Sequence, residues 1–163
     1  RCGANIEKAF QQKNRWRDDK KKHDEERRVA LEQAIARERQ TELQRLLDQL
    51  DEPQQHDFAI YCLHQYGTEA VEPLIALLTD EDPDARFGAA HTLGLMNDER
   101  AIPPLVNALS DPEPAVRWWA ADALGKLRAT NAIPALKKMS KDKHRGVREH
   151  AANILRTLET TAQ

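Results

Sequence analysis

The hydrophobic positions of this chain recur with a step of 31 residues from about residue 70 onward. The segments AVEPLIALL, AIPPLVNAL and AIPALKKMS begin at Ala70, Ala101 and Ala132. The same step links further positions in the second half of each unit: Arg86, Arg117, Arg148, Leu93, Leu124 and Leu155. A constant period of this length is typical of tandem structural units that stack their hydrophobic faces on one another.

Each unit is predicted to form two antiparallel helices. Prolines fall in the first turn of the first helix, where a missing N–H costs little, at Pro73, Pro103, Pro104 and Pro134. The acidic turns DEDPD and DPEP then interrupt the chain and offer carboxylates that cap the second helix. One period earlier, ELQRLLDQLDEPQQHDFAIYCLHQYG places Leu43 31 residues before Leu74, which predicts a more divergent unit. We expect four helix pairs, from about residue 39 to 159.

Composition agrees with an all-α fold and sets the N-terminal segment apart. The 163 residues are 40% hydrophobic but only 5% aromatic, which is typical of helices packed through small residues. Residues 17–28, RDDKKKHDEERR, contain no apolar side chain. We therefore predict a charged helical arm or linker over residues 1–38 and an α-solenoid over 39–159. The arm could be a spacer, a coiled-coil strand or partly disordered, and the sequence leaves these alternatives open.

The repeat resembles a known family at two adjoining segments. DPEPAVRWWAADALGKL and AIPALKKM are similar to the HEAT-like repeat of the phycobilisome-lyase type, a short α-solenoid unit whose second helix runs V-R-x-x-A-A-x-A-L-G. The resemblance covers residues 70–159 and, more loosely, 39–69. It implies stacked helix pairs but no single function, because such repeats occur in bilin-lyase subunits, in a di-iron protein hydroxylase and in many adaptors.

The second helices carry the candidate binding surface. In residues 115–127 a core stripe is expected at Val116, Ala120, Ala123, Leu124 and Leu127. The opposite face, extended by the repeat step, gives the predicted partner-binding residues: Phe87, His91, Trp118, Trp119, Asp122, Lys126, Glu149, His150 and Asn153. Second helices of such a solenoid line its concave surface, and aromatic anchors are typical of binding hot spots. The alternative is that the two tryptophans are ordinary core.

Charge is distributed unevenly although the formal net charge is only −2. Residues 57–122 carry 12 acidic against three basic residues, a net of −9, whereas residues 123–156 carry nine basic against two acidic residues, a net of +7. The basic patch is predicted at Lys137, Lys138, Lys141, Lys143 and Arg145. It could dock an acidic partner, or it could only solvate a terminal repeat. Nucleic acid is not the favoured partner.

The sequence indicates no catalytic centre. It has no phosphate-binding glycine loop, no nucleophile elbow and no Cys-x-x-Cys pair. The hydroxylase relatives carry repeated His-Glu pairs as iron ligands, whereas here Glu149 and His150 occur in the reverse order and without a counterpart. We therefore predict no catalytic residue, no metal and no cofactor.

Two functions remain. The first is a protein–protein interaction module, a scaffold or adaptor that binds a partner protein or peptide on its concave face. The second is a bilin-lyase-like accessory subunit that binds a tetrapyrrole and its acceptor protein. The two cysteines lie 60 residues apart and no apolar run approaches a membrane span. We expect a cytoplasmic protein, or, because the chain begins at Arg1, the soluble part of a longer, anchored one.

Overall fold

The computed structural model describes residues 2–50, 52 and 55–161, and in this part of the chain it contains helices and connecting turns but no strand. The fold is therefore all-α, as predicted. The helices are α1 (Cys2–Asp48), α2 (His56–Tyr66), α3 (Thr68–Leu77), α4 (Pro83–Met96), α5 (Ile102–Ala108), α6 (Pro114–Lys126), α7 (Ile133–Met139) and α8 (Arg145–Thr161). By their contacts the residues form two compact units, Arg1–Glu42 and Leu43–Gln163.

The N-terminal unit is a single helix. α1 continues without a break through the expected boundary near residue 38, because no glycine or proline occurs between Ala4 and Glu52. Along its charged stretch Arg28 donates to Glu25 at 2.6 Å and to Glu32 at 3.3 Å. These contacts lie one helical turn apart and support a helix whose side chains are exposed.

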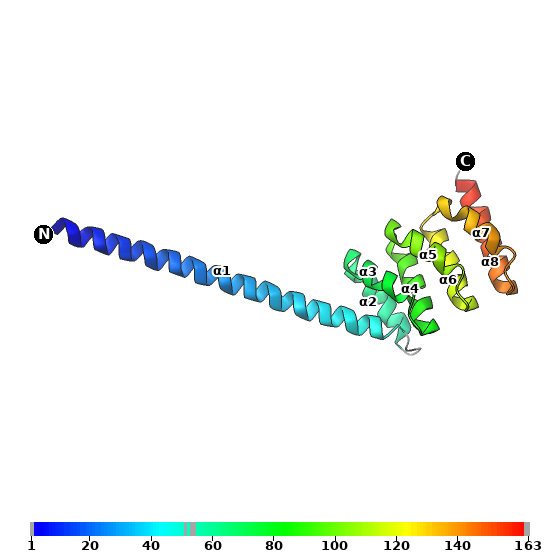
Figure 1. Ribbon diagram of the computed structural model, residues 1–163, viewed down its shortest axis with the longest axis horizontal. Coiled ribbons are helices and arrows are strands. Elements are labelled where there is room, and N and C mark those ends of the chain that lie inside the picture. Colours follow the sequence, from blue (N-terminus) through cyan, green and yellow to red (C-terminus); the bar gives the residue numbers. More distant parts are fainter. Residues whose placement is uncertain (1, 51, 53–54, 162–163) are drawn as a thin grey trace. The chain divides into compact units, whose positions relative to one another are not determined.

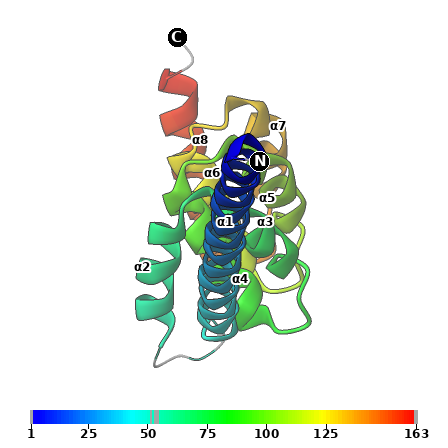
Figure 2. The ribbon, with the colours of Figure 1, turned by 90° about the vertical axis from the view of Figure 1, so that its left-hand side faces the viewer.

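The second unit is a row of helix pairs in two layers. Figure 1 shows α3–α4, α5–α6 and α7–α8 following one another along the row, and Figure 2 separates α3, α5 and α7 from α2 and α8. We call α3, α5 and α7 the first helices and α2, α4, α6 and α8 the second helices. The C-terminal end of α1 buries Leu43, Leu46 and Leu47 in the same core as the helix pairs.

The starts of α5 and α7 differ from the start of α3, and this difference corrects one detail of the expectation. Short 3-10 turns, η1 (Glu99–Ala101) and η2 (Thr130–Ala132), precede α5 and α7. The equivalent residues 68–70 are already part of α3, so Pro73 lies inside that helix instead of in its first turn. The cause is local: α3 starts directly after Gly67, whose φ of 58° turns the chain sharply.

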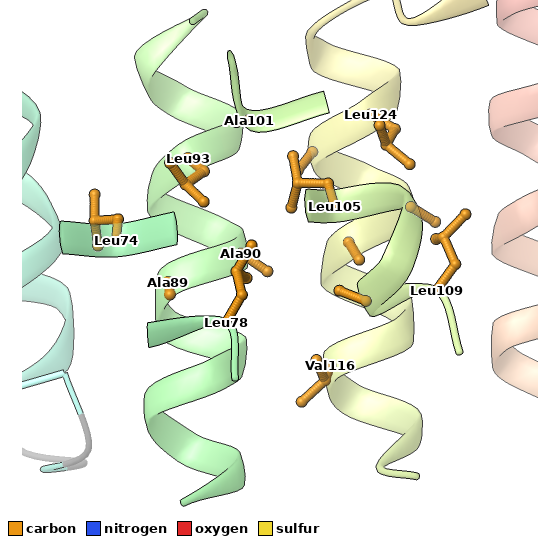
Figure 3. Close-up of a cluster of buried hydrophobic side chains, with 14 of the residues drawn as sticks. Leu74, Leu78, Ala89, Ala90, Leu93, Ala101, Leu105, Leu109, Val116 and Leu124 are labelled. Atoms are coloured by element: carbon orange, nitrogen blue, oxygen red, sulfur yellow. The ribbon is translucent and has the colours of Figure 1, made fainter. Parts of the chain in front are cut away.

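The core runs continuously between the two layers (Figure 3). Leu74, Leu93, Leu105 and Leu124 are fully buried at equivalent or neighbouring positions of successive pairs. The predicted stripe of α6 is confirmed at Val116, Ala120, Ala123 and Leu124, which are buried, while Leu127 is half-buried.

Small residues bring the second helices close together. A Cβ atom added to Gly94 of α4 would lie 2.7 Å from the Cα of Ala123 on α6. A Cβ added to Gly125, one period later, would lie 2.8 Å from the Cδ1 of Ile154 on α8. The glycines therefore let α4, α6 and α8 pack side by side, and this close packing positions the surface described next.

Arginines of the second helices tie each pair to the following one. Arg86 donates from Nε and Nη2 to the carboxylate of Asp111 at 2.8 and 3.0 Å, and from Nη1 to the carbonyls of Asp80 and Glu81. These contacts raise the pKa of Arg86, with the hydrogen bonds to Asp111 as the largest cause. A bidentate pair of this kind fixes both distance and orientation between neighbouring pairs.

Arg117 repeats this arrangement one period later. Its Nε and Nη2 each lie 2.8 Å from the carboxylate of Asp142, and its Nη1 donates to the carbonyls of Asp111 and Pro112. The hydrogen bonds from Arg117 lower the pKa of Asp142 despite partial desolvation of that carboxylate. We call these two linked sets the arginine ladder.

Candidate binding surface

Four rings from three helices form a row across the second helices. His91 on α4 stacks on Trp119 of α6 with centroids 3.9 Å apart and planes 28° apart. Trp119 meets Trp118 edge-on at 4.9 Å, and Trp118 stacks on His150 of α8 at 3.8 Å and 14°. We call His91, Trp119, Trp118 and His150 the aromatic row. The close approach of the helices at their glycines brings these rings into contact.

The two adjacent tryptophans of α6 lie between the core and the surface. Both lie beside the core stripe of α6 and are half-buried against the core, rather than fully exposed or fully enclosed. Because each ring stacks on a histidine of a neighbouring helix, each contributes to the packing between pairs. Their remaining exposed edges belong to the second-helix surface.

Asp122 and Lys126 lie on the same face of α6 as the rings. Lys126 Nζ is 2.9 Å from Oδ2 of Asp122 and 5.9 Å from the ring centre of Trp119, a distance that permits a cation–π contact. The imidazole of His150 and then the ammonium of Lys126 lower the pKa of the Asp122 carboxyl, against an opposing effect of burial. The site thus combines half-buried rings with an ionised carboxylate.

His150 carries a polar atom that is not satisfied. Its Nε2 is buried and lies 3.4 Å from Oδ1 of Asp122, but it makes no well-aligned hydrogen bond with any of the described residues. The contact has the distance of an ion pair without the alignment of a hydrogen bond. Buried polar atoms without a partner are uncommon, and this one lies at the end of the aromatic row.

Not every predicted partner-binding residue joins this cluster. Phe87 is half-buried against the core of α4. Glu149 is exposed and accepts from Arg145 at 2.6 Å, an interaction that lowers the pKa of its carboxyl. Asn153 is exposed and accepts from Arg156 at 2.8 Å. The aromatic row, Asp122 and Lys126 form one site, whereas Glu149 and Asn153 pair with Arg145 and Arg156 on α8.

The structure adds a cavity of 410 Å³ that sequence analysis missed. It lies between α2 and α4 and is lined by Ile60, Tyr61, His64, His91 and Leu95. His91 belongs to the aromatic row as well, so the cavity and the row are continuous. The Tyr61 residue is 65% exposed. The sequence holds one indication that α2 differs from the other second helices. Tyr61 and His91 are separated by 30 residues instead of 31, which shifts α2 out of register.

The predicted basic patch is exposed, and part of it is paired. Lys137 Nζ lies 3.0 Å from Glu159, and Arg145 is held by Glu149. Lys138, Lys141 and Lys143 are exposed in α7 and the turn that follows it. The patch therefore presents ammonium groups from a surface that is distinct from the aromatic row.

Two further observations concern ligands and membranes. Among the described residues no group of three or more histidine, cysteine or carboxylate side chains could hold a metal ion. None of the helices in the part of the chain that the structure describes is both long and apolar enough to span a bilayer.

Known proteins share this architecture. The family model for HEAT repeats matches residues 41–113 and 102–162, which together make up more than half of the chain. The chain is similar to a solved structure of the complex of CpcE and CpcF of phycocyanin lyase from Nostoc sp. PCC7120, with 26% identity and a TM-score of 0.65. That similarity covers 72% of this chain and 78% of the lyase chain.

A second solved structure is human deoxyhypusine hydroxylase in complex with glycerol. It is 31% identical with a TM-score of 0.62, and the match covers 76% of this chain but only 45% of the hydroxylase. The chain thus spans less than half of that enzyme. None of the curated proteins matches this chain.

Proposed function

Because this chain belongs to the HEAT-repeat family, we propose that it is a scaffold or adaptor that binds a partner protein or peptide on its second-helix face, which we expect to be concave. The observation that carries the proposal is the continuity between the aromatic row and the cavity beside Tyr61 and Leu95. Exposed aromatic and aliphatic groups beside a cavity are typical anchors for a partner side chain. No catalytic constellation accompanies them among the described residues, and we propose a non-catalytic role.

The surface has two kinds of residue with different expected roles. Tyr61 and Leu95 are exposed, so they are available for direct contact with a partner. Trp118, Trp119 and His150 are half-buried and their rings contact one another, so they shape the surface and contribute their free edges. A partner would therefore insert an apolar side chain near Tyr61 and lie along the row toward α8.

The test uses a partner recovered with the intact chain and then measures direct binding by calorimetry. Tyr61→Ala and Leu95→Asp should each weaken binding by about tenfold or more, the scale of a hot-spot contact. Ala76→Glu on α3 and Asn107→Asp on α5 are matched controls, because both residues are exposed on the first helices. Weakening by the control variants alone would contradict the proposed face.

The similarity to phycocyanin lyase favours a second candidate, a bilin-lyase-like accessory subunit that binds a tetrapyrrole and its acceptor protein. The flat rings of the aromatic row could stack on a tetrapyrrole. Mixing the protein with free bilin tests this directly, since binding should shift the visible absorption band to longer wavelength. An unchanged spectrum together with tight binding of a protein partner would favour the adaptor.

We further propose that the basic patch of the last pair contacts an acidic partner. The support is the net charge of +7 over residues 123–156 and the exposed lysines Lys138, Lys141 and Lys143. A cytoplasmic location is proposed as well, on the two widely separated cysteines. Binding of an octaglutamate peptide that weakens steeply with added salt would support the patch, and binding that is absent at low salt would contradict it.

A further inference from the structure

The arginine ladder follows a rule that holds for two consecutive pairs. One edge of the guanidinium group, Nη1, donates to two backbone carbonyls of the turn within its own pair. The other edge, Nε and Nη2, holds an aspartate carboxylate 25 residues further along the chain. Each aspartate also accepts from the backbone N–H two residues after it, and this local hydrogen bond helps to orient the carboxylate toward the arginine.

Arg148 repeats the first half of this rule. Its Nη1 donates to the carbonyls of Asp142 and Lys143 at 2.8 and 3.1 Å, which are the register equivalents of the carbonyls that Arg117 binds. The guanidinium group is therefore held in the orientation that the other two arginines adopt. Within the described residues no carboxylate pairs with its Nε and Nη2 edge, and Arg148 is half-buried whereas Arg86 and Arg117 are 8% and 4% exposed.

A residue beside Arg148 also lacks the covering that its equivalents have in the two earlier pairs. Ala90 and Ala121, four residues after Arg86 and Arg117, are fully buried by the following pair. Their equivalent, Ala152, is exposed on α8. A small apolar residue and an oriented guanidinium edge therefore lie together at the end of the described row.

The occupant that fits this surface is an acidic segment rather than another close-packed helix pair. The glycines that allow close approach, Gly94 and Gly125, are replaced in the next period by Arg156, whose side chain is exposed. A second helix could not approach α8 as closely there. Exposed Lys143 and Arg145 next to the site add positive charge, which favours a carboxylate-bearing loop.

We propose that Arg148 is a carboxylate-binding site for a partner protein, which takes an aspartate from an acidic turn of the kind that Arg86 and Arg117 bind within this chain. The inference rests on the proposed acidic partner and assigns the residue that would recognise it. It also predicts geometry: the carboxylate binds Nε and Nη2 side by side, while the surrounding lysines contribute only long-range attraction.

The probe is a blocked peptide with the sequence LSDPEPA, which copies residues 109–115 and therefore the turn that Arg86 binds. Its binding to the full chain is followed by NMR at the backbone amide signals of α8 in every variant. In the wild-type protein it is also followed at the Nε–H signal of Arg148, which is assigned by its loss in Arg148→Lys. Millimolar binding is expected, and it should weaken by about tenfold in Arg148→Lys, because lysine keeps the charge but lacks the two-pronged edge. Arg145→Lys is the matched control and should change little, since Arg145 is already paired with Glu149.

A second comparison needs no protein variant. The peptide with asparagine in place of its aspartate should shift the Arg148 signal about tenfold less in the wild-type protein. Equal shifts by both peptides, or no shift of Arg148 at about 10 mM peptide, would overturn the site. Octaglutamate distinguishes a failure of the Arg148 site from a failure of the basic patch. If octaglutamate binds but LSDPEPA does not shift the Arg148 signal, only the Arg148 proposal is wrong. If neither peptide binds, both proposals fall.

Discussion

The indole of Trp118 on α6 stacks on the imidazole of His150 on α8, with centroids 3.8 Å apart and planes inclined by 14°. The contact joins the second helices of two successive pairs. It means that the rings of the second-helix face hold the pairs together as well as shaping a surface. Any experiment on these residues must therefore measure folding and binding separately.

We expect Trp118→Ala to lower the free energy of unfolding by about 2 kcal/mol, less than a fully buried tryptophan because the ring is half-buried. Urea unfolding at neutral pH measures the change. Trp16→Ala is the control, since Trp16 is 64% exposed on α1 and should cost less than about 0.5 kcal/mol. Equal, negligible losses in both variants would show that the stacking adds nothing to stability.

The two close glycine contacts should respond differently to the same change. Gly94→Ala places a methyl group 2.7 Å from the backbone Cα of Ala123, which cannot move alone, so we expect a loss of about 1–2 kcal/mol. Gly125→Ala meets the flexible end of Ile154, and the gain in helix propensity should offset the crowding to within about 0.5 kcal/mol. Chemical denaturation compares the two, and a larger loss for Gly125→Ala would contradict this distinction between a backbone neighbour and a side-chain neighbour.

Asp142→Asn should destabilise the protein by about 3 kcal/mol at pH 7, because it leaves the guanidinium group of Arg117 buried without its counter-charge. Asp80→Asn is the matched control. Asp80 is the register equivalent of Asp142, but its carboxylate accepts from the backbone of Asp82 and makes no ion pair with an arginine among the described residues. A loss of similar size in both variants would mean that the turn, not the ion pair, supplies the stability.

The same pair predicts a pH dependence with a definite sign. Hydrogen bonds from Arg117 lower the pKa of Asp142 in the folded protein, so its contribution is complete above the unfolded pKa of about 4 and is lost as pH falls through the lower folded pKa. The wild-type protein should lose stability more steeply below about pH 4 than Asp142→Asn does. Parallel curves for the two proteins in acid would contradict this assignment.

Deleting residues 1–28 should leave the melting temperature of the helix pairs within about 5 °C of the original value. The reason is that the side chains of residues 15–28 are exposed, so little apolar surface is lost with them. Differential scanning calorimetry measures the change. A fall of more than about 10 °C would show that the arm stabilises the pairs, beyond what about 1 kcal/mol does to a domain of this size.

Much of the fold follows from the sequence because the repeat step fixes equivalent positions. Leu93, Leu124 and Leu155 share one register, and all three are buried as a constant hydrophobic period requires. The contacts of the arginine ladder were harder to predict from the sequence. The step aligns Arg86 with Arg117 but does not reveal that each binds an aspartate 25 residues later, in the following pair.

The helices and the face that carry the aromatic row were predictable, but the contacts between its rings were not. Trp118 is the register equivalent of Glu149, yet its ring stacks on His150, because neighbouring helices meet with an offset that depends on their close packing. The cavity beside Tyr61 was missed for a related reason. The first period is one residue shorter than the others. Tyr61 therefore does not align with the positions that the 31-residue step makes equivalent.

The arginine ladder also bears on how such a chain could be lengthened or shortened. Removal of the 31 residues 99–129 would place Asp142 in the position of Asp111, opposite Arg86, so every buried arginine would regain a carboxylate. Duplication of the same stretch would restore the pairing as well. Whole units can thus be removed or inserted without leaving a buried arginine unpaired. A cut between Arg86 and Asp111 that is not a whole number of units would separate the arginine from its aspartate.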